Sequence, residues 1–91
     1  MVLEERVKIL EDRCGKIDPN TTLLEIYQSN LEEIISECSN LIRKLKTKKK
    51  SNQYNSDDAI EYFNTISAEL LSIRSQAKQK LSIITNRQRT V

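Results

Sequence analysis

We expect an all-α protein: a long antiparallel, coiled-coil-like helical hairpin with a short N-terminal helix, which is a candidate third member of a three-helix bundle. The main observation is that apolar residues recur at alternating steps of three and four along most of the chain, as they do in heptad repeats. The 91 residues include one glycine and one proline, so the usual residues of hairpin turns and tight loops are scarce. Only 4% of the residues are aromatic, which favours stripes of Leu, Ile and Val over an aromatic core. The length suits a single helical domain over residues 1–91.

The first helix is expected over residues 2–14. Its apolar residues follow steps of four and three and therefore share one face of a helix. They are Leu3, Val7, Leu10, Cys14 and, just beyond, Ile17. Gly15 predicts the end of this helix, because glycine often takes the left-handed conformation after the last helical turn.

The second helix is expected over residues 19–48 and is followed by a linker over 49–56. Asp18 is a suitable N-cap and Pro19 a suitable first helical residue, while Thr22 and Glu25 form an overlapping capping-box pattern. The apolar stripe again alternates steps of three and four. It consists of Leu24, Tyr27, Leu31, Ile34, Cys38, Leu41 and Leu45.

The third helix is expected over residues 57–86, with a frayed tail over 87–91. Asp57 and Asp58 lie in its first turn, where the helix dipole favours negative charge. A strict heptad would place an apolar residue at position 80, but the chain has Lys80 there and continues the stripe at Leu81. This local shift is typical of a stutter in a helical repeat.

Several apolar residues lie outside the three stripes and widen the apolar faces beyond what a two-helix seam requires. We expect these residues to bind a partner; they are Leu23, Ile26, Ile35, Ile42, Ile60, Leu71 and Ile83. The short first helix is long enough to cover only about half of the hairpin. An extended apolar surface that stays exposed usually marks an interaction site. We therefore expect a non-catalytic helical subunit or adaptor whose partner is another copy of itself or a different helical protein.

A basic run near the end of the second helix allows a different interpretation. Its six cations, as a candidate anion-binding site, are Arg43, Lys44, Lys46, Lys48, Lys49 and Lys50. The alternative function is a basic helical module that binds nucleic acid or an acidic surface through residues 43–50. However, no aromatic residues are interleaved to stack on bases, and cations are also favoured at the C-terminus of any helix.

Catalysis and cofactor binding are not expected from this composition. The chain has no histidine, and its single glycine cannot build a glycine-rich phosphate loop. Cys14 and Cys38 fall on apolar stripes, where cysteine usually packs as a small hydrophobe. We expect no metal, no cofactor, no small-molecule substrate and no membrane span, and an intracellular location, cytoplasmic or nuclear, because the N-terminus lacks the apolar core of a signal peptide.

The segment LEERVKILEDRCG resembles the start of the smallest shoulder subunit of dynactin over about thirteen residues of heptad pattern. The plan of a long helical hairpin is similar to helical subunits of kinetochore and vesicle-tethering complexes, and to small type III secretion co-chaperones. These resemblances imply a cytoskeletal, kinetochore or tethering type of complex, with a small helical co-chaperone as an alternative. They rest on no specific motif, so no functional residue is carried over.

Overall fold

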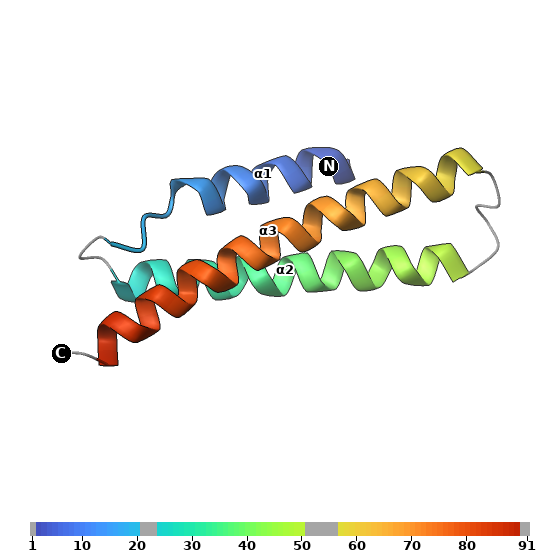
Figure 1. The fold of residues 1–91 in the computed structure, drawn as a ribbon. Helices are drawn as coiled ribbons and strands as arrows, with labels where there is room; N and C mark the ends of the chain where they lie inside the picture. Colours follow the sequence, from blue (N-terminus) through green and yellow to red (C-terminus); the bar gives the residue numbers. More distant parts are fainter. Residues whose placement is uncertain (1, 21–23, 51–56, 90–91) are drawn as a thin grey trace.

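The protein is all-helical over the residues that its computed structural model describes, which are 2–20, 24–50 and 57–89. Helix α1 spans Leu3–Lys16, α2 spans Leu24–Lys50 and α3 spans Asp57–Arg89. No strand occurs within these ranges. Helices α2 and α3 form the expected antiparallel hairpin, and α1 lies along it (Figure 1).

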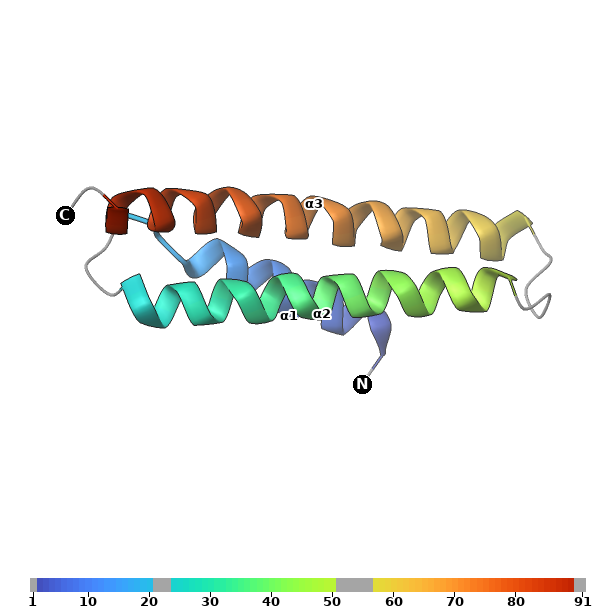
Figure 2. The same cartoon turned by 90° about the horizontal axis from the view of Figure 1, so that it is seen from below.

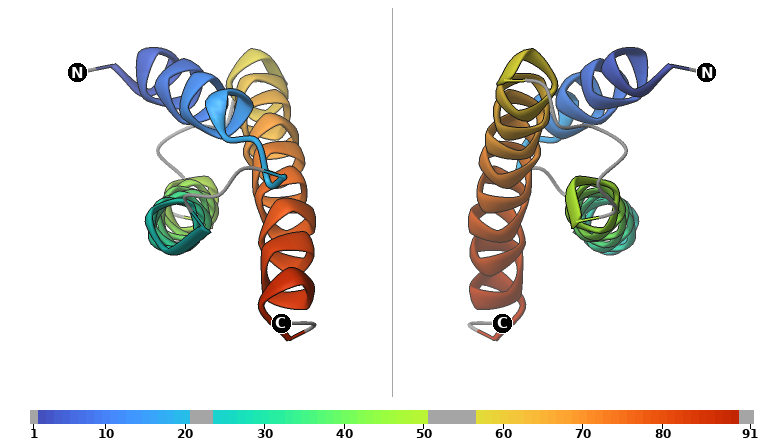
Figure 3. Two further views of the ribbon diagram at one scale, coloured as in Figure 1. Left: turned by 90° about the vertical axis from the view of Figure 1, so that its left-hand side faces the viewer. Right: turned by 90° about the vertical axis from the view of Figure 1, so that its right-hand side faces the viewer.

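The three helices form an elongated bundle. Seen end-on, α1, α2 and α3 occupy the corners of a triangle, and α3 crosses the other two obliquely (Figure 3). The bundle measures 53 × 20 × 16 Å and its radius of gyration is 15.5 Å. A compact domain of this length would have a radius of gyration of about 12 Å. The long shape leaves much of the hairpin surface outside the reach of α1.

Helix α1 continues through Gly15, which corrects the expected end at residue 14. Glycine permits a left-handed conformation without requiring it. The helix ends at Lys16, and the backbone N–H of Ile17 donates to the Cys14 carbonyl oxygen at 3.3 Å. The helix dipole is complemented at both ends of α1. The first turn carries the acids Glu4 and Glu5, and the last turn carries the bases Arg13 and Lys16.

Helix α2 begins later than expected. Pro19 and Asn20 form a turn, and the Asn20 N–H donates to Asp18 Oδ1 at 2.9 Å. Asp18 thus uses its carboxylate as expected of a cap, but it stabilises a local turn instead of the start of α2. The second start signal, at Thr22, lies outside the described residues. At the other ends, α2 reaches Lys50 and α3 reaches Arg89, so both run slightly beyond their expected limits.

The core is apolar throughout the described residues, with no buried polar or charged side chain. All three helices contribute to it. Its members are Val7, Leu10, Cys14, Ile17, Leu31, Ile34, Cys38, Leu41, Ile42, Leu45, Phe63, Ile66, Leu70, Ile73, Ala77 and Ile84. Ile42 is 6% exposed, which corrects the expectation that it lies outside the core. Because α2 packs against both α1 and α3, its buried arc is wide enough to hold the adjacent residues Leu41 and Ile42.

Candidate interaction surface

The hairpin has one side that α1 covers, which we call the α1-covered side. There, Arg13 of α1 lies between two acids of α2, with Nη2 at 3.5 Å from Glu33 and Nη1 at 4.0 Å from Glu37. On α3, Lys80 Nζ donates to the Cys14 carbonyl oxygen at 2.5 Å. That carbonyl belongs to the last turn of α1, and it accepts from the Ile17 N–H as well. Lys80 therefore caps α1, and this explains why the apolar stripe of α3 skips its position.

Near the N-terminal end of α1, Glu4 lies close to Tyr62 of α3, whose phenol can donate a hydrogen bond to the Glu4 carboxylate. This bond is the main cause that raises the pKa of Tyr62 above its ordinary value, and burial and the Glu4 charge act in the same direction. The rings of Tyr62 and Phe63 lie 5.7 Å apart, between centroids, at 59°. Polar contacts thus fix both ends of α1 around its buried stripe.

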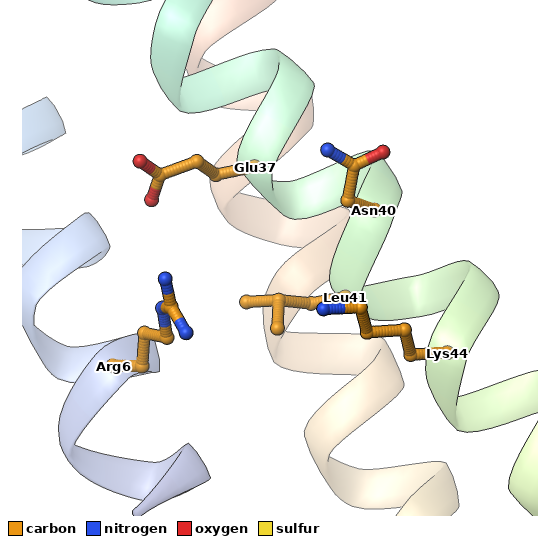
Figure 4. A pocket seen from close by; sticks show the side chains of 5 residues that line it. All are labelled: Arg6, Glu37, Asn40, Leu41 and Lys44. Atoms are coloured by element: carbon orange, nitrogen blue, oxygen red, sulfur yellow. The ribbon is translucent and has the colours of Figure 1, made fainter. Parts of the chain in front are cut away.

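A shallow hollow lies between α1 and α2 on this side (Figure 4). It is lined by Arg6, Glu37, Asn40, Leu41 and Lys44. The cations of Arg6 and Lys44 face the same space as the Glu37 carboxylate, so the hollow has no single sign of charge. Such a lining does not favour a small anion over a small cation.

A second hollow lies between α1 and α3. It is lined by Glu11, Glu69, Ser72, Ile73 and Gln76. Only two of these residues are carboxylates, and no group of three or more metal-ligating side chains occurs in the described part of the chain. Neither hollow therefore has the ligands of a metal site.

The other side of the hairpin is not covered by α1, as the view from below shows (Figure 2). There, Arg74 Nη1 of α3 donates to Ser39 Oγ of α2 at 3.2 Å. Ser39 lies two residues after Glu37, which places it about 200° around α2 from the contact with α1. Residues three, four or seven positions from Ser39 and Arg74 share this surface. We call it the open face; it comprises Glu32, Ile35, Ser39, Ile42, Arg43 and Lys46 of α2 and Ser67, Leu71, Arg74, Lys78 and Leu81 of α3.

The open face contains part of the predicted partner-binding set. Leu71 is 45% exposed, Ile35 is half-buried against the core, and Ile42 is buried beneath them. Ile60, two heptads before Arg74, is half-buried and extends the same row toward the start of α3.

The other predicted partner-binding residues lie elsewhere. Ile26 is 58% exposed and Ile83 is 42% exposed. Ile26 lies seven residues before Glu33, and Ile83 lies three residues after Lys80. Both therefore share the α1-covered side of their helices, at positions beyond the end of α1. Leu23 lies outside the described residues. The structure thus brings Ile35, Ile60 and Leu71 onto one face and separates them from Ile26 and Ile83.

The basic run is distributed around α2. Arg43 and Lys46 are exposed on the open face, and Arg43 Nη2 donates to Asn40 Oδ1 at 2.6 Å. Lys44 instead lines the hollow beside α1. The side chains of Lys48, Lys49 and Lys50 lie outside the described residues. Among the described cations, the run does not form one continuous anion-binding surface.

Two cations of the open face were not predicted as site residues. These are Arg74 and Lys78 of α3; Arg74 lies across from Ser39 of α2, and the same antiparallel register places Lys78 across from Ile35. The sequence shows that Arg74 lies three residues after Leu71 and that Lys78 lies seven residues after Leu71, but the pairing of Ser39 with Arg74 is needed to place both cations beside α2. Glu32 is the single acid on this face, against four cations.

Cys14 and Cys38 are free thiols and both are buried. Burial raises the pKa of Cys14. Burial and the nearby Cys14 raise the pKa of Cys38 to about 11, against the opposing effect of Arg74. Thiols in this state are poor nucleophiles, which fits their place in the core.

Comparisons with known protein families, with curated proteins and with solved structures find no match for this chain. No helix within the described ranges is both long enough and apolar enough to cross a membrane.

Proposed function

We propose that this protein is a non-catalytic helical subunit or adaptor that assembles with a partner helix through its open face. The observation that carries this proposal is Leu71, a large apolar side chain that is 45% exposed in the middle of α3. It shares its surface of α3 with Arg74, which contacts Ser39 on the side of the hairpin away from α1. A long hairpin with one helix already docked on one side is well suited to receive a second helix on the other.

The cytoskeletal, kinetochore or vesicle-tethering type of complex is the setting that we propose for this activity. Complexes of these types use long helices whose apolar stripes pack and whose flanking charges select partner and register. A co-chaperone that masks a partner's helix would use the same surface but release the partner. Measuring how fast bound partner exchanges with free partner distinguishes a permanent complex from a transient one.

The test is a double substitution, Ile35→Asp and Leu71→Asp, in the full chain expressed in its native cells. Charged side chains at these positions oppose the burial that helix docking requires. Proteins that co-purify with the wild-type chain should be lost from the variant in quantitative mass spectrometry. Circular dichroism is measured for the double variant and for Leu71→Asp alone, because Ile35 is half-buried against the core whereas Leu71 is largely outside it.

The matched control is Ile9→Asp, because Ile9 is 42% exposed on the outer surface of α1, similar to Leu71. This variant should keep all partners. If the double variant retains the wild-type partners while Ile9→Asp loses them, the outer surface of α1 is the binding site and the assignment to the open face is wrong.

A further inference from the structure

We propose that the partner of the open face is an amphipathic helix of another protein with acidic residues flanking its apolar stripe. This inference rests on the proposed function and adds the chemical class of the partner. It follows from the way apolar and charged side chains are arranged across α2 and α3.

Four apolar residues of α2 and α3 form the apolar row of the open face. Ile35 and Ile42 come from α2, and Leu71 and Leu81 come from α3. Their exposure rises from buried Ile42 through half-buried Ile35 and Leu81 to Leu71 at 45%. A row of this kind between two helices receives the apolar stripe of a third helix, as ridges fill grooves.

Cations border this row on both helices. Arg43 and Lys46 lie on α2, and Arg74 and Lys78 lie on α3. None of the four makes an ion pair with a carboxylate in the described part of the chain. A helix docked on the open face would therefore meet positive charge from both α2 and α3, which acidic flanking residues complement.

One ion-pair cluster on the α1-covered side shows how this hairpin holds a helix. There, α1 buries Val7, Leu10 and Cys14, and its Arg13 lies against the acids Glu33 and Glu37 of α2. The hairpin thus receives one helix by burying an apolar stripe and pairing a cation of that helix with its own acids. On the open face the hairpin supplies the cations, so the incoming helix must supply the acids.

A second copy of this chain fits the open face poorly. In a symmetric dimer the same surface of each copy meets its counterpart. The four cations of one open face would then lie against the same four cations of the other. Like charges placed opposite each other are destabilising, so the charge pattern selects a different, acidic partner.

The experiment uses two synthetic helical peptides of about 20 residues, long enough to span on the order of 30 Å. Both carry the same Leu and Ile heptad stripe, and they differ only in having Glu or Lys at the flanking positions. Binding of each fluorescent peptide to the full chain is measured by anisotropy. We expect the acidic peptide to bind about tenfold tighter than the basic peptide, with the preference decreasing as salt is raised.

The decisive variant is the double charge reversal Lys46→Glu and Lys78→Glu, at two exposed positions on different helices. It should reverse the preference, so that the basic peptide binds more tightly. Leu71→Asp should weaken binding of the acidic peptide about tenfold or more. Circular dichroism and solution mass are measured for each variant, so that loss of folding is recognised separately.

Four results would overturn the inference: equal binding of both peptides, no binding of either, unchanged binding by Leu71→Asp, or a self-association of the chain that Leu71→Asp dissolves. Tight binding of duplex DNA that depends on Lys46 and Lys78, without peptide preference, would also overturn it. The proposed function fails separately. If Ile35→Asp with Leu71→Asp removes native partners but the charge reversal does not, the docking site stands and only the acidic partner is wrong.

Discussion

The two sides of the hairpin are built from the same kind of apolar stripe but end in different states. On the α1-covered side, an intramolecular helix fills the stripe, and cations of one helix meet acids or carbonyl oxygens of another. On the open face the apolar row is partly exposed and its cations meet no carboxylate within the described residues. The difference shows that α1 covers one side of the hairpin and leaves the apolar row of the other side partly exposed.

The largest contrast between the sides should appear in stability. Leu10 of α1 is 1% exposed, so Leu10→Ala should lower the free energy of unfolding by about 2–5 kcal/mol. Leu71→Ala removes the same atoms from the open face and should cost less than about 1 kcal/mol. Urea denaturation followed by circular dichroism measures both. Similar losses for the two variants would mean that the open face is part of the core.

The thiols give a second contrast. Because the pKa of Cys38 is raised from its ordinary value of 9.0 to about 11, its thiolate fraction at pH 8 falls about a hundredfold. Native protein should therefore react with iodoacetamide far more slowly than urea-unfolded protein. A cysteine placed on the open face by Lys78→Cys should react at the rate of an exposed thiol. Fast labelling of Cys38 in the native protein would contradict the packing of α1 against α2.

The same pKa determines a pH dependence of stability. Above about pH 9 the unfolded chain loses the Cys38 proton, while the folded chain retains it until about pH 11. The unfolded state then binds fewer protons than the folded state, so the free energy of unfolding falls as the pH rises through this window. Denaturation midpoints between pH 8 and pH 11 measure the slope. Cys38→Ala should make the slope shallower, whereas an unchanged slope would assign it to other groups.

A smaller effect is expected at the polar contacts of the α1-covered side. Lys80→Ala removes the hydrogen bond to the Cys14 carbonyl oxygen and should lower the free energy of unfolding by about 0.5–1.5 kcal/mol. Lys78→Ala, two residues away on the open face, is the matched control and should change stability by less than about 0.5 kcal/mol. Equal effects would show that the Lys80 contact contributes nothing measurable.

The smallest effect is expected at Gly15. It is exposed within α1, and a Cβ added there would meet no atom within 4 Å. Gly15→Ala should therefore raise the free energy of unfolding by about 0.5–1 kcal/mol at most, through the higher helix propensity of alanine. A loss of stability in thermal denaturation would indicate that the end of α1 needs the freedom of glycine.

The heptad spacing was sufficient to predict the three helices, their antiparallel hairpin and most of the core. This spacing is informative because one face of each helix is buried, and the residues on one face of a helix recur at steps of three and four. Ile42 was placed wrongly because a two-helix seam was assumed, whereas α2 packs against two neighbours. Gly15 and Pro19 were placed wrongly because each of these residues is compatible with more than one local conformation.

The candidate surface was predictable only in part. Ile35 and Leu71 were recognisable as apolar residues outside the stripes, since helical spacing alone reveals them. The positions of Arg74 and Lys78 beside α2 were not predictable, because the sequence does not show which residues of α2 and α3 lie opposite each other. The hydrogen bond between Arg74 and Ser39, which are 35 residues apart, supplies that register.

The contacts of Lys80 and Arg87 also have a consequence for the order in which the chain folds. Lys80 donates to the Cys14 carbonyl oxygen, and Arg87 Nη1 donates to the Pro19 carbonyl oxygen at 2.8 Å; the paired residues are separated by 66 and 68 positions. During synthesis α1 leaves the ribosome before the residues that hold its C-terminal end have been made. An isolated helix of 14 residues is only marginally stable in water, so α1 must wait for the end of α3. Of these three helices, the first to be synthesised is therefore expected to be the last to be fixed in place.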